Sequence, residues 1–205
     1  KKFKKLYRII NFTEEFFSKH SDVLIVANGQ NALSTFQKRP SRSEIILNYP
    51  NDFGTGGSHS ARKNEIFTIA FTGHIRRHRG LETLASVMRD LKDIQLVITG
   101  RNEDNVLLND IKNIQNVRYL GILDDSALLE IERSANVMFA FYDPVFFQNN
   151  MPLPNKIFEA MMCSTPIVTN IAKEIVNESD CGIVVDYNNM EQIKEALVTL
   201  RDDPH

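Results

Sequence analysis

The stretch EIFTIAFTGHIRRHRGLETLASVMRDL, residues 65–91, carries the pattern that the rest of the chain repeats. Residues 65–72 are mostly apolar and β-branched, which predicts a buried strand. Apolar side chains recur at helical spacing in residues 81–91, which predicts an amphipathic helix. Between them lies GHIRRHRG, residues 73–80, a basic segment bounded by glycines. The stretch therefore predicts a strand, a turn and a helix.

The same alternation continues after residue 91. Further strands are predicted at residues 94–99, 116–120, 137–141, 167–169 and 182–185, and helices at residues 105–112, 124–135, 154–163, 172–177 and 190–200. Apolar strands that alternate with amphipathic helices are typical of a parallel sheet with helices on both faces. The predicted fold class is therefore α/β, with a Rossmann-like doubly wound parallel sheet over residues 64–205.

Residues 1–63 are organised differently. A helix at residues 3–19, a strand at 22–27, a short helix at 31–37 and a strand at 44–47 predict one more α/β unit. The segment NYPNDFGTGGSHSARKN, residues 48–64, has the Gly, Ser and Asn content of a linker. Its GTGGS follows no predicted strand directly and opens no helix, so the linker interpretation is preferred to a phosphate loop. Two domains are predicted, 1–63 and 64–205.

The composition narrows the class of protein. The chain has 205 residues, a formal net charge of −2 and 24% charged residues, which disfavours a nucleic-acid-binding protein. Two cysteines, Cys163 and Cys181, cannot form a disulfide framework, so a cytoplasmic location is predicted. No apolar run approaches the ~20 residues of a transmembrane helix. The chain does not begin with Met, which suggests a fragment of a longer protein.

The basic segment 73–80 is the first candidate for a binding loop. Ligands of open α/β sheets bind at the carboxyl ends of the strands, where loops meet helix N-termini. Gly73 allows a close turn, and the arginines at 76, 77 and 79 predict an anion site, since guanidinium groups pair with phosphate oxygens. The segment is not GxGxxG, which disfavours a dinucleotide dehydrogenase. A solvated basic surface is the alternative interpretation.

Two histidines in this segment raise the question of a metal. His74 and His78 stand four residues apart, a spacing that binds zinc on a helix. The neighbouring positions supply no carboxylate or thiolate, and the arginines repel a cation. No metal site is predicted.

Two further loops complete the candidate site. Residues 100–103 follow the second strand, and residues 147–155 lead from the fourth strand to a helix. Free backbone N–H groups of Asn155 and Lys156 would hold a phosphate there. Glu159, one turn further along, is placed to accept hydrogen bonds from ribose hydroxyls, unless it is only an acid favoured near a helix N-terminus. The loops together predict a nucleoside diphosphate site.

Four stretches, in this order, resemble one family. They are FTGHIRRHRG (71–80), LVITGRNED (96–104), VRYLGILDDSALLEIERSAN (117–136) and LPNKIFEAMMCSTPIVTN (153–170). They resemble the G-R-x-x-x-x-K-G segment, the following strand and glycine-rich turn, the "v-x-f-x-G" stretch and the "E-A-M-A-x-G-x-P-V-V" helix of group 1 (family 4) retaining glycosyltransferases. The resemblance covers the C-terminal, donor-binding domain of this GT-B fold, and residues 22–48 resemble the end of the preceding acceptor domain.

The resemblance implies a role for each matching residue. Arg79, at the position of the family's lysine, and Lys156 are the implied catalytic residues, which neutralise the diphosphate leaving group. Glu159 matches the second acid of the E-x7-E motif and binds the ribose. The implied donor-binding residues are Gly73, His74, Arg76, Gly100, Arg101, Ile122, Leu123, Asn149, Asn150, Asn155 and Glu159. Among these, Ile122 and Leu123 fall where backbone groups read the nucleobase.

The sequence departs from the family pattern at several positions. His74 stands where the family has arginine, so Arg76 or Arg77 is expected to substitute for it. Met151 stands at the first acid of E-x7-E, which faces the donor sugar in the family. Prolines 152 and 154 replace glycines, as in a subgroup with a Pro-x-Lys-x-Phe-Glu pattern. Asn149 and Asn150 are then expected to contact the sugar.

The resemblance implies a metal-independent transferase without a cofactor. It would move a sugar from UDP- or GDP-sugar to a glycan or lipid-linked acceptor with retention, with peripheral contact to a membrane. The missing N-terminal domain would supply the acceptor site, so this chain alone is expected to bind nucleotide and transfer little. One alternative is a non-catalytic nucleotide-sugar-binding or scaffold domain, which Met151 favours. The other is a related epimerase or phosphorylase, but residues 146–154 offer no acids or bases that an epimerase would need.

Overall fold

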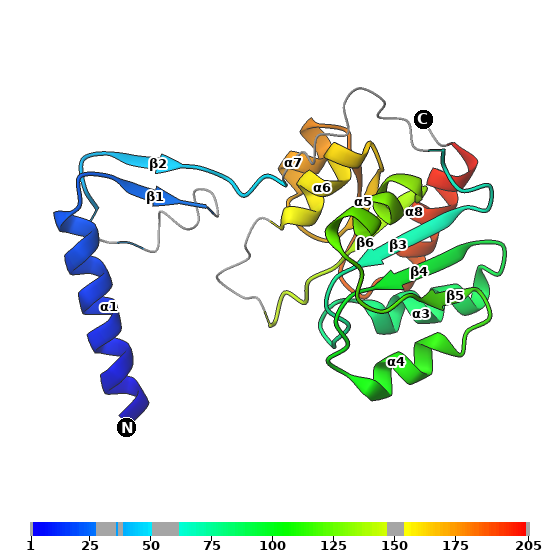
Figure 1. The fold of residues 1–205 in the computed structure, drawn as a ribbon, viewed down its shortest axis with the longest axis horizontal. Coiled ribbons are helices and arrows are strands. Elements are labelled where there is room, and N and C mark those ends of the chain that lie inside the picture. The colour runs from blue at the N-terminus through cyan, green and yellow to red at the C-terminus, as the bar shows by residue number, and fades with distance from the viewer. Residues whose placement is uncertain (1, 28–35, 37–38, 51–61, 147–153, 204–205) are drawn as a thin grey trace. The chain divides into compact units, whose positions relative to one another are not determined.

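The computed structural model of this chain describes residues 2–27, 36, 39–50, 62–146 and 154–203. These residues fall into two compact units (Figure 1). The smaller unit is formed chiefly by residues 1–49, and the larger by residues 50–148 and 154–205. The predicted short helix at residues 31–37 lies outside the described residues, except for Phe36.

The smaller unit contains one helix and two short strands. Helix α1 (Lys2–His20) precedes strand β1 (Leu24–Val26), which pairs in parallel with β2 (Ser43–Ile45). Two polar side chains return to the backbone at the end of α1. Ser21 Oγ donates to the carbonyl of Ser18 over 2.8 Å, and His20 Nδ1 lies 2.7 Å from the carbonyl oxygen of Phe16. The Ser21 hydroxyl thus engages a carbonyl group that a helix end leaves without an intrahelical donor.

The larger unit is built on a parallel sheet whose strand order reverses near its middle. Its strands are β3 (Thr68–Thr72), β4 (Gln95–Thr99), β5 (Val117–Tyr119), β6 (Val137–Ala140), β7 (Ile167–Thr169) and β8 (Gly182–Val184). They lie in the order β5-β4-β3-β6-β7-β8. This is the doubly wound order with a switch point between the first and fourth strands, here β3 and β6. The predicted Rossmann-like α/β fold is confirmed.

Helices cover both faces of the sheet (Figure 1). They are α3 (Leu81–Asp90), α4 (Asn105–Lys112), α5 (Asp125–Ser134), α6 (Asn155–Cys163), α7 (Lys173–Glu178) and α8 (Met190–Asp202). Helix α3 contacts α4 and α8, and α5 contacts α6. In the described part of the chain, no helix is both long and apolar enough to cross a bilayer.

The core lies between the central strands and these helices. All five residues of β3 and all four of β6 are buried, because both strands are central and covered on two faces. Fully buried aliphatic side chains such as Ile69, Leu84 and Leu96 each contribute about 1.5–3 kcal/mol through removal of apolar surface from water. This core fixes the positions at which the strands end and the loops begin.

Helix α6 differs from its prediction in two details. Pro154 is not the first helical residue but the N-cap, with extended φ and ψ of −75° and 137°. The sequence also predicts Met161 and Met162 on the buried face, but both are only half-buried. Ala160 and Cys163 are buried instead, next to Ile157 and Phe158. The buried face is turned where α6 packs against α5.

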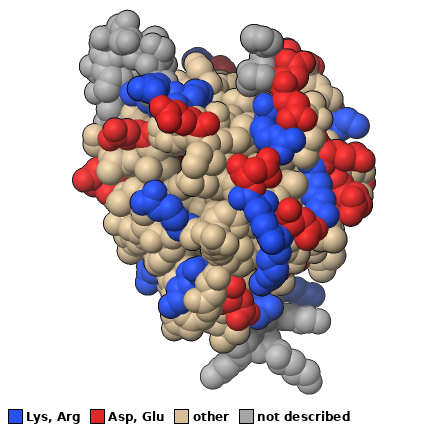
Figure 2. Space-filling model, turned by 90° about the vertical axis from the view of Figure 1, so that its right-hand side faces the viewer, with Lys and Arg blue, Asp and Glu red and all other residues tan. Residues whose placement is uncertain are grey.

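Charged side chains of both signs are interspersed on the face drawn in Figure 2. Two ion pairs tie α8 to the end of α3 and the turn that follows it. Arg201 Nη1 lies 2.5 Å from Asp93 Oδ2, and the ammonium of Lys194 pairs with Asp90. Solvent and salt screen exposed pairs of this kind, so they add little to the stability of the fold.

Candidate functional site

The loops after β3, β4 and β5 are hydrogen-bonded to one another at the carboxyl edge of the sheet. The N–H of Gly73 donates to the carbonyl of Thr99 over 3.0 Å, and that of Gly100 donates to Gly121 over 2.8 Å. Further out, the N–H of Ile75 donates to the carbonyl of Arg101 over 2.9 Å. The parallel register of the strands therefore continues into the loops, which brings the predicted glycines 73 and 100 together.

The tight backbone approach expected at Gly73 is required of Gly100 instead. An added Cβ at Gly73 would meet no atom within 4 Å. At Gly100, where φ is +133°, an added Cβ would lie 2.0 Å from the carbonyl oxygen of Gly73. Glycine is needed at position 100 because the neighbouring loop passes directly over it.

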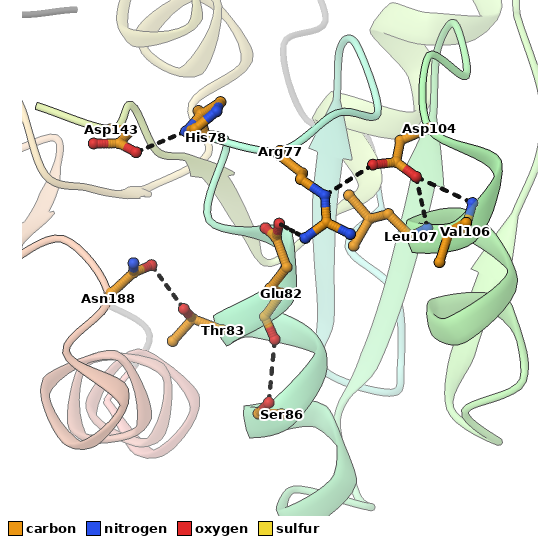
Figure 3. Close-up of polar contacts among 10 residues, drawn as sticks. All are labelled: Arg77, His78, Glu82, Thr83, Ser86, Asp104, Val106, Leu107, Asp143 and Asn188. Carbon is orange, nitrogen blue, oxygen red and sulfur yellow. Dashed lines mark hydrogen bonds and ion pairs between the residues drawn. The ribbon is translucent and has the colours of Figure 1, made fainter. Parts of the chain in front are cut away.

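The arginines of segment 73–80 do not form one shared anion site. Arg77 Nε lies 3.2 Å from Asp104 Oδ2, and its Nη1 lies 3.8 Å from Glu82 Oε1 (Figure 3). Arg76 Nη1 lies 3.8 Å from Glu103, a residue that also pairs with His74. Acidic side chains therefore balance Arg76 and Arg77, which the sequence could not show because these acids come largely from the next loop.

His74 also pairs with an acid of the next loop. Its Nδ1 lies 2.6 Å from Glu103 Oε1. This hydrogen bond is the main reason that the pKa of Glu103 lies below its ordinary value. His78 pairs with a different acid, Asp143, at 2.7 Å. The two histidines that the sequence places four residues apart therefore contact separate carboxylates.

Asp104 joins the basic segment to the start of α4 (Figure 3). One carboxylate oxygen accepts from the N–H groups of Val106 and Leu107, at 3.1 and 3.0 Å, and the other faces Arg77. The hydrogen bond from Leu107 is the largest cause that holds the pKa of Asp104 below its ordinary value, and Arg77 adds to it. Asp104 is thus an N-cap and an ion-pair partner at once.

We predict that Asp104→Ala lowers the denaturation midpoint more than Asp104→Asn does. Asparagine keeps the N-cap oxygen and loses only the charge toward Arg77, whereas alanine loses both. The stabilisation from a lowered carboxyl pKa is present above the unfolded pKa of about 3.9 and disappears as the pH falls through the folded pKa. Denaturant titrations at pH 7 and pH 3 should therefore show a larger Ala-to-wild-type difference at pH 7. Equal midpoints for the Ala and Asn variants would contradict the capping role.

Arg79 has a different environment from its two neighbours. Its guanidinium carbon lies 4.3 Å from the ring centroid of Tyr142, which follows β6. Its Nε is buried and has no hydrogen-bond partner in the described part of the chain. A buried donor without an acceptor costs about 1–3 kcal/mol. The residue therefore presents an unsatisfied cationic donor at the switch point between β3 and β6, where open α/β sheets bind ligands.

The loops after β3 and β6 are held together beside Arg79. His78 accepts the N–H of Asp143 through its carbonyl over 3.1 Å, in addition to the side-chain contact between the two residues. The His78 ring also stacks on Phe146, with centroids 4.8 Å apart. Asn170 braces the same loop, because its side-chain amide bonds to both the N–H and the carbonyl of Tyr142 at 2.8 Å.

The mouth of α6 provides backbone donors. Pro154 caps the helix without a side-chain hydrogen bond among the residues that the structure describes. The N–H groups of the first helical residues, Asn155 and Lys156, have no acceptor within the helix. Asn155 is exposed there. The predicted contacts Asn149 and Asn150, and Met151, lie outside the described residues.

The side chain of Lys156 points into a cluster that the sequence prediction missed. Its ammonium donates to Glu132 Oε1 on α5 over 2.9 Å and also pairs with Glu159 on its own helix. Glu132 is buried, with a side chain only 3% exposed. The spacing from Leu129 to Glu132 to Ala135 could have shown that this acid lies on the buried face of its helix.

The charged groups of this cluster shift one another's pKa values. Burial lowers the pKa of Lys156, but the two carboxylates outweigh it and the net shift is upward. Burial raises the pKa of Glu159, Glu132 adds to the rise and Lys156 opposes it. Burial, with Glu132 nearby, raises the pKa of the Cys163 thiol to about 12, which fits the predicted role of this cysteine as a core residue. Lys156 thus remains an ammonium between two acids.

The remaining predicted residues line the outer part of the edge. Ile122 is 74% exposed just beyond β5, and Leu123 beside it is half-buried. Arg101 is exposed in the loop after β4. An exposed isoleucine next to hydrogen-bonded loops gives this end of the edge an apolar surface.

The chain is similar to several proteins that are named for sugar transfer or the synthesis of a sugar phosphate. A phosphatidyl-myo-inositol mannosyltransferase of Mycobacterium leprae (strain TN) is 27% identical over 142 residues, which cover 65% of this chain and 37% of that protein. The solved sucrose-phosphate synthase of Thermosynechococcus elongatus is similar with a TM-score of 0.66 and 19% identity, over 95% of this chain and 52% of its own. The pneumococcal O-GlcNAc transferase GtfA in complex with UDP and GlcNAc gives a TM-score of 0.58 at 15% identity. The similarity covers 90% of this chain and 39% of that chain.

These comparisons establish fold and family at different levels. At such low identities the solved structures show a shared fold, and the chain spans 37% of the length of its curated relative. The family match is broader, because it takes in nearly all of the larger unit, residues 66–203. With this match, the chain belongs to the family Glycosyl transferases group 1.

Proposed function

We propose that this chain is the donor-binding part of a glycosyltransferase that uses a nucleoside diphosphate sugar. The observation that carries the proposal is the buried Nε of Arg79 at the switch point of the sheet, which no described residue satisfies, in a chain of this family. A diphosphate supplies the acceptor oxygens that such a donor lacks. The mannosyltransferase relative and the transferase structure in complex with UDP support the same substrate class.

The proposed mechanism is electrostatic. As the bond between sugar and phosphate breaks, negative charge grows on the diphosphate. Arg79 and the N–H groups at the mouth of α6 would stabilise this charge, and Glu159 would accept hydrogen bonds from the ribose. We propose that Lys156 contributes through its backbone N–H and through Glu159, since two carboxylates already engage its ammonium. Retention of configuration and independence from metal rest on the family resemblance.

We propose that residues 1–63 end an acceptor-binding domain and that residues 64–205 form the donor domain. The division into two compact units near Pro50 supports this assignment. The acceptor, a glycan or a lipid-linked sugar, would then contact a part of the whole protein outside the larger unit. The chain alone should bind nucleotide without efficient transfer.

Thermal unfolding with nucleotides tests the proposal. UDP or GDP should stabilise the chain, by about 2.7 kcal/mol at a concentration of 100 times Kd, whereas NAD should not. Arg79→Met should weaken nucleotide binding by roughly 10–100-fold, since a hydrogen bond to a charged group contributes about 1.5–3 kcal/mol. Arg89→Met is the matched control, because Arg89 is an exposed arginine in the last turn of α3. No stabilisation by any nucleoside diphosphate would overturn the proposed site.

A non-catalytic nucleotide-sugar-binding domain is the second candidate, favoured by Met151 at the position of the family's first acid. The two candidates differ in turnover by the whole protein. Slow hydrolysis of UDP- or GDP-sugar supports the transferase. Tight binding of the same nucleotide-sugar without hydrolysis or transfer supports the binding domain.

A further inference from the structure

Glu132 is a carboxylate in the core next to the proposed nucleotide site. Glu132 is 2% exposed and lies on α5, a helix in which the sequence predicts no site residue. Three side chains from other elements approach it. Thr72 Oγ1 donates to Oε1 over 2.5 Å, Lys156 Nζ donates to the same oxygen, and Cys163 Sγ lies 4.0 Å from Oε2. All three are donors, which is the environment of an ionised carboxylate.

The cluster joins the parts of the fold that meet at the site. Thr72 is the last residue of β3, directly before the loop that begins at Gly73. Lys156 and Glu159 lie one turn apart on α6, whose first N–H groups face the proposed phosphate. Glu132 is therefore bonded both to the end of β3 and, through Lys156, to Glu159. A group held from two elements keeps its position better than one held by its own helix alone.

Two acids share one lysine in this cluster. If Glu159 alone held Lys156, the ammonium could leave with it toward solvent, because both side chains are about one-fifth exposed. Glu132 fixes the ammonium from the buried side, and its side chain is almost fully enclosed. Breaking that contact would leave a buried charge without a partner, so the lysine is held in place.

We propose that Glu132 is a positioning residue of the nucleotide site, which orients the Glu159 carboxylate toward ribose hydroxyls by holding Lys156. The inference rests on the proposed function, and it goes beyond it by assigning a role to a residue that does not reach the ligand. A residue that only stabilised the fold would affect ribose and deoxyribose nucleotides alike. Loss of a positioning residue changes the ratio of the two Kd values.

The test compares Kd values of UDP and 2′-deoxy-UDP, or of the guanosine pair if GDP is the nucleotide that binds. Wild-type protein should prefer the ribonucleotide by about 10-fold or more, as expected for hydrogen bonds to a charged acceptor. Glu159→Gln should remove most of this preference. Glu132→Gln should reduce it by about 3–10-fold although Glu159 is intact. Glu130→Gln, on the exposed side of the same helix, is the matched control and should leave the ratio unchanged.

Glutamine fits position 132 because its carbonyl can accept from Thr72 while its amide faces Cys163, and the loss of the negative charge weakens the hold on the Lys156 ammonium. Glu132→Asp is the second variant, should Glu132→Gln fail to fold. It keeps the charge but withdraws the carboxylate by one methylene, so the ribose preference should fall to an intermediate value. A folded Glu132 variant with the full preference would overturn the positioning role and leave the proposed function intact.

The pH dependence gives an independent readout. The groups that face Glu159 are Lys156 on its own helix and Glu132 on α5, with Cys163 close to both acids. In the wild type, the ribose preference should fall as the pH drops through the raised pKa of Glu159. Glu132→Gln removes a negative neighbour, so this fall should move to lower pH. An unmoved profile would overturn the proposal, and absence of any nucleotide binding by the wild type would instead overturn the proposed function.

Discussion

Replacement of Lys156 by methionine should destabilise the larger unit by about 3–5 kcal/mol, the usual cost of removing one partner from a buried ion pair. Glu132 would remain in the core with Glu159 beside it and no cation between them. Methionine fills a volume similar to the lysine stem, so the loss comes from charge rather than from a cavity. Urea unfolding at pH 7 measures this loss in the free energy of unfolding.

The same variant should show a characteristic pH dependence. Without the ammonium, which lowers it, the pKa of Glu159 rises further above the unfolded value of about 4.3. A raised carboxyl pKa destabilises the fold above the folded pKa, and this loss disappears as the pH falls toward the unfolded pKa. The difference in free energy of unfolding between variant and wild type should therefore become smaller from pH 7 to pH 4. In the wild type, the contribution of Lys156 is complete below about pH 10.4 and is lost above it, because its pKa is raised.

Two controls separate the buried cluster from ordinary ion pairs. Lys194→Met removes a lysine whose acidic partners Asp90 and Glu191 are largely exposed, and it should cost much less stability than Lys156→Met. Adding Glu132→Gln to Lys156→Met should recover part of the stability, since a neutral amide replaces the buried charge. Equal losses for Lys156→Met and Lys194→Met would show that Lys156 is not required to balance Glu132.

Gly100→Ala should cost a similar amount, about 3–5 kcal/mol, because it combines backbone strain with overpacking. The new Cβ would lie 2.0 Å from the carbonyl oxygen of Gly73, and φ is +133°. That clash involves backbone on both sides, so no side-chain rotation relieves it. The loop after β3 would have to move, and with it the position of Arg79. The midpoint of chemical denaturation and the affinity for nucleotide should both fall.

Gly121→Ala is the matched control for the clash. Gly121 also has a positive φ, +77°, but an added Cβ there would meet no atom within 4 Å. Only the conformational strain remains, about 1–2 kcal/mol. If Gly100→Ala were no more destabilising than Gly121→Ala, the close approach of the two loops in solution would be refuted.

The fold could be predicted because its signals are local. Each predicted strand from residue 65 onward corresponds to a strand in the structure, with ends that shift by up to three residues. Buried parallel strands need continuous apolar runs, and amphipathic helices need one apolar face, so both leave a periodic pattern in the chain. The helix that begins after Pro154 was found in this way. Its buried face was found only in part: Ile157 and Phe158 are buried as predicted, but Ala160 and Cys163 are buried in place of Met161 and Met162 where α6 contacts α5.

The site could be predicted only in part. Position relative to the strand ends indicated the loop that carries Arg79 and the start of the helix that carries Glu159, because ligands of such sheets bind there. The acids that balance Arg76 and Arg77 are Glu103, Asp104 and Glu82, and two of them lie in a different loop. A count of basic residues within one segment cannot register charges that the fold brings from another.

By itself, the amino-acid sequence determined the alternation of strands and helices, the doubly wound class and the resemblance to the group 1 family. The folded arrangement was needed to show which glycine must stay small, which arginine buries an Nε without a hydrogen-bond acceptor among the described residues, and which acid holds Lys156. The reason is physical: secondary structure depends on neighbours within a few residues, whereas burial, charge balance and close contact depend on residues such as Thr72, Glu132 and Lys156, which meet only after the chain has folded.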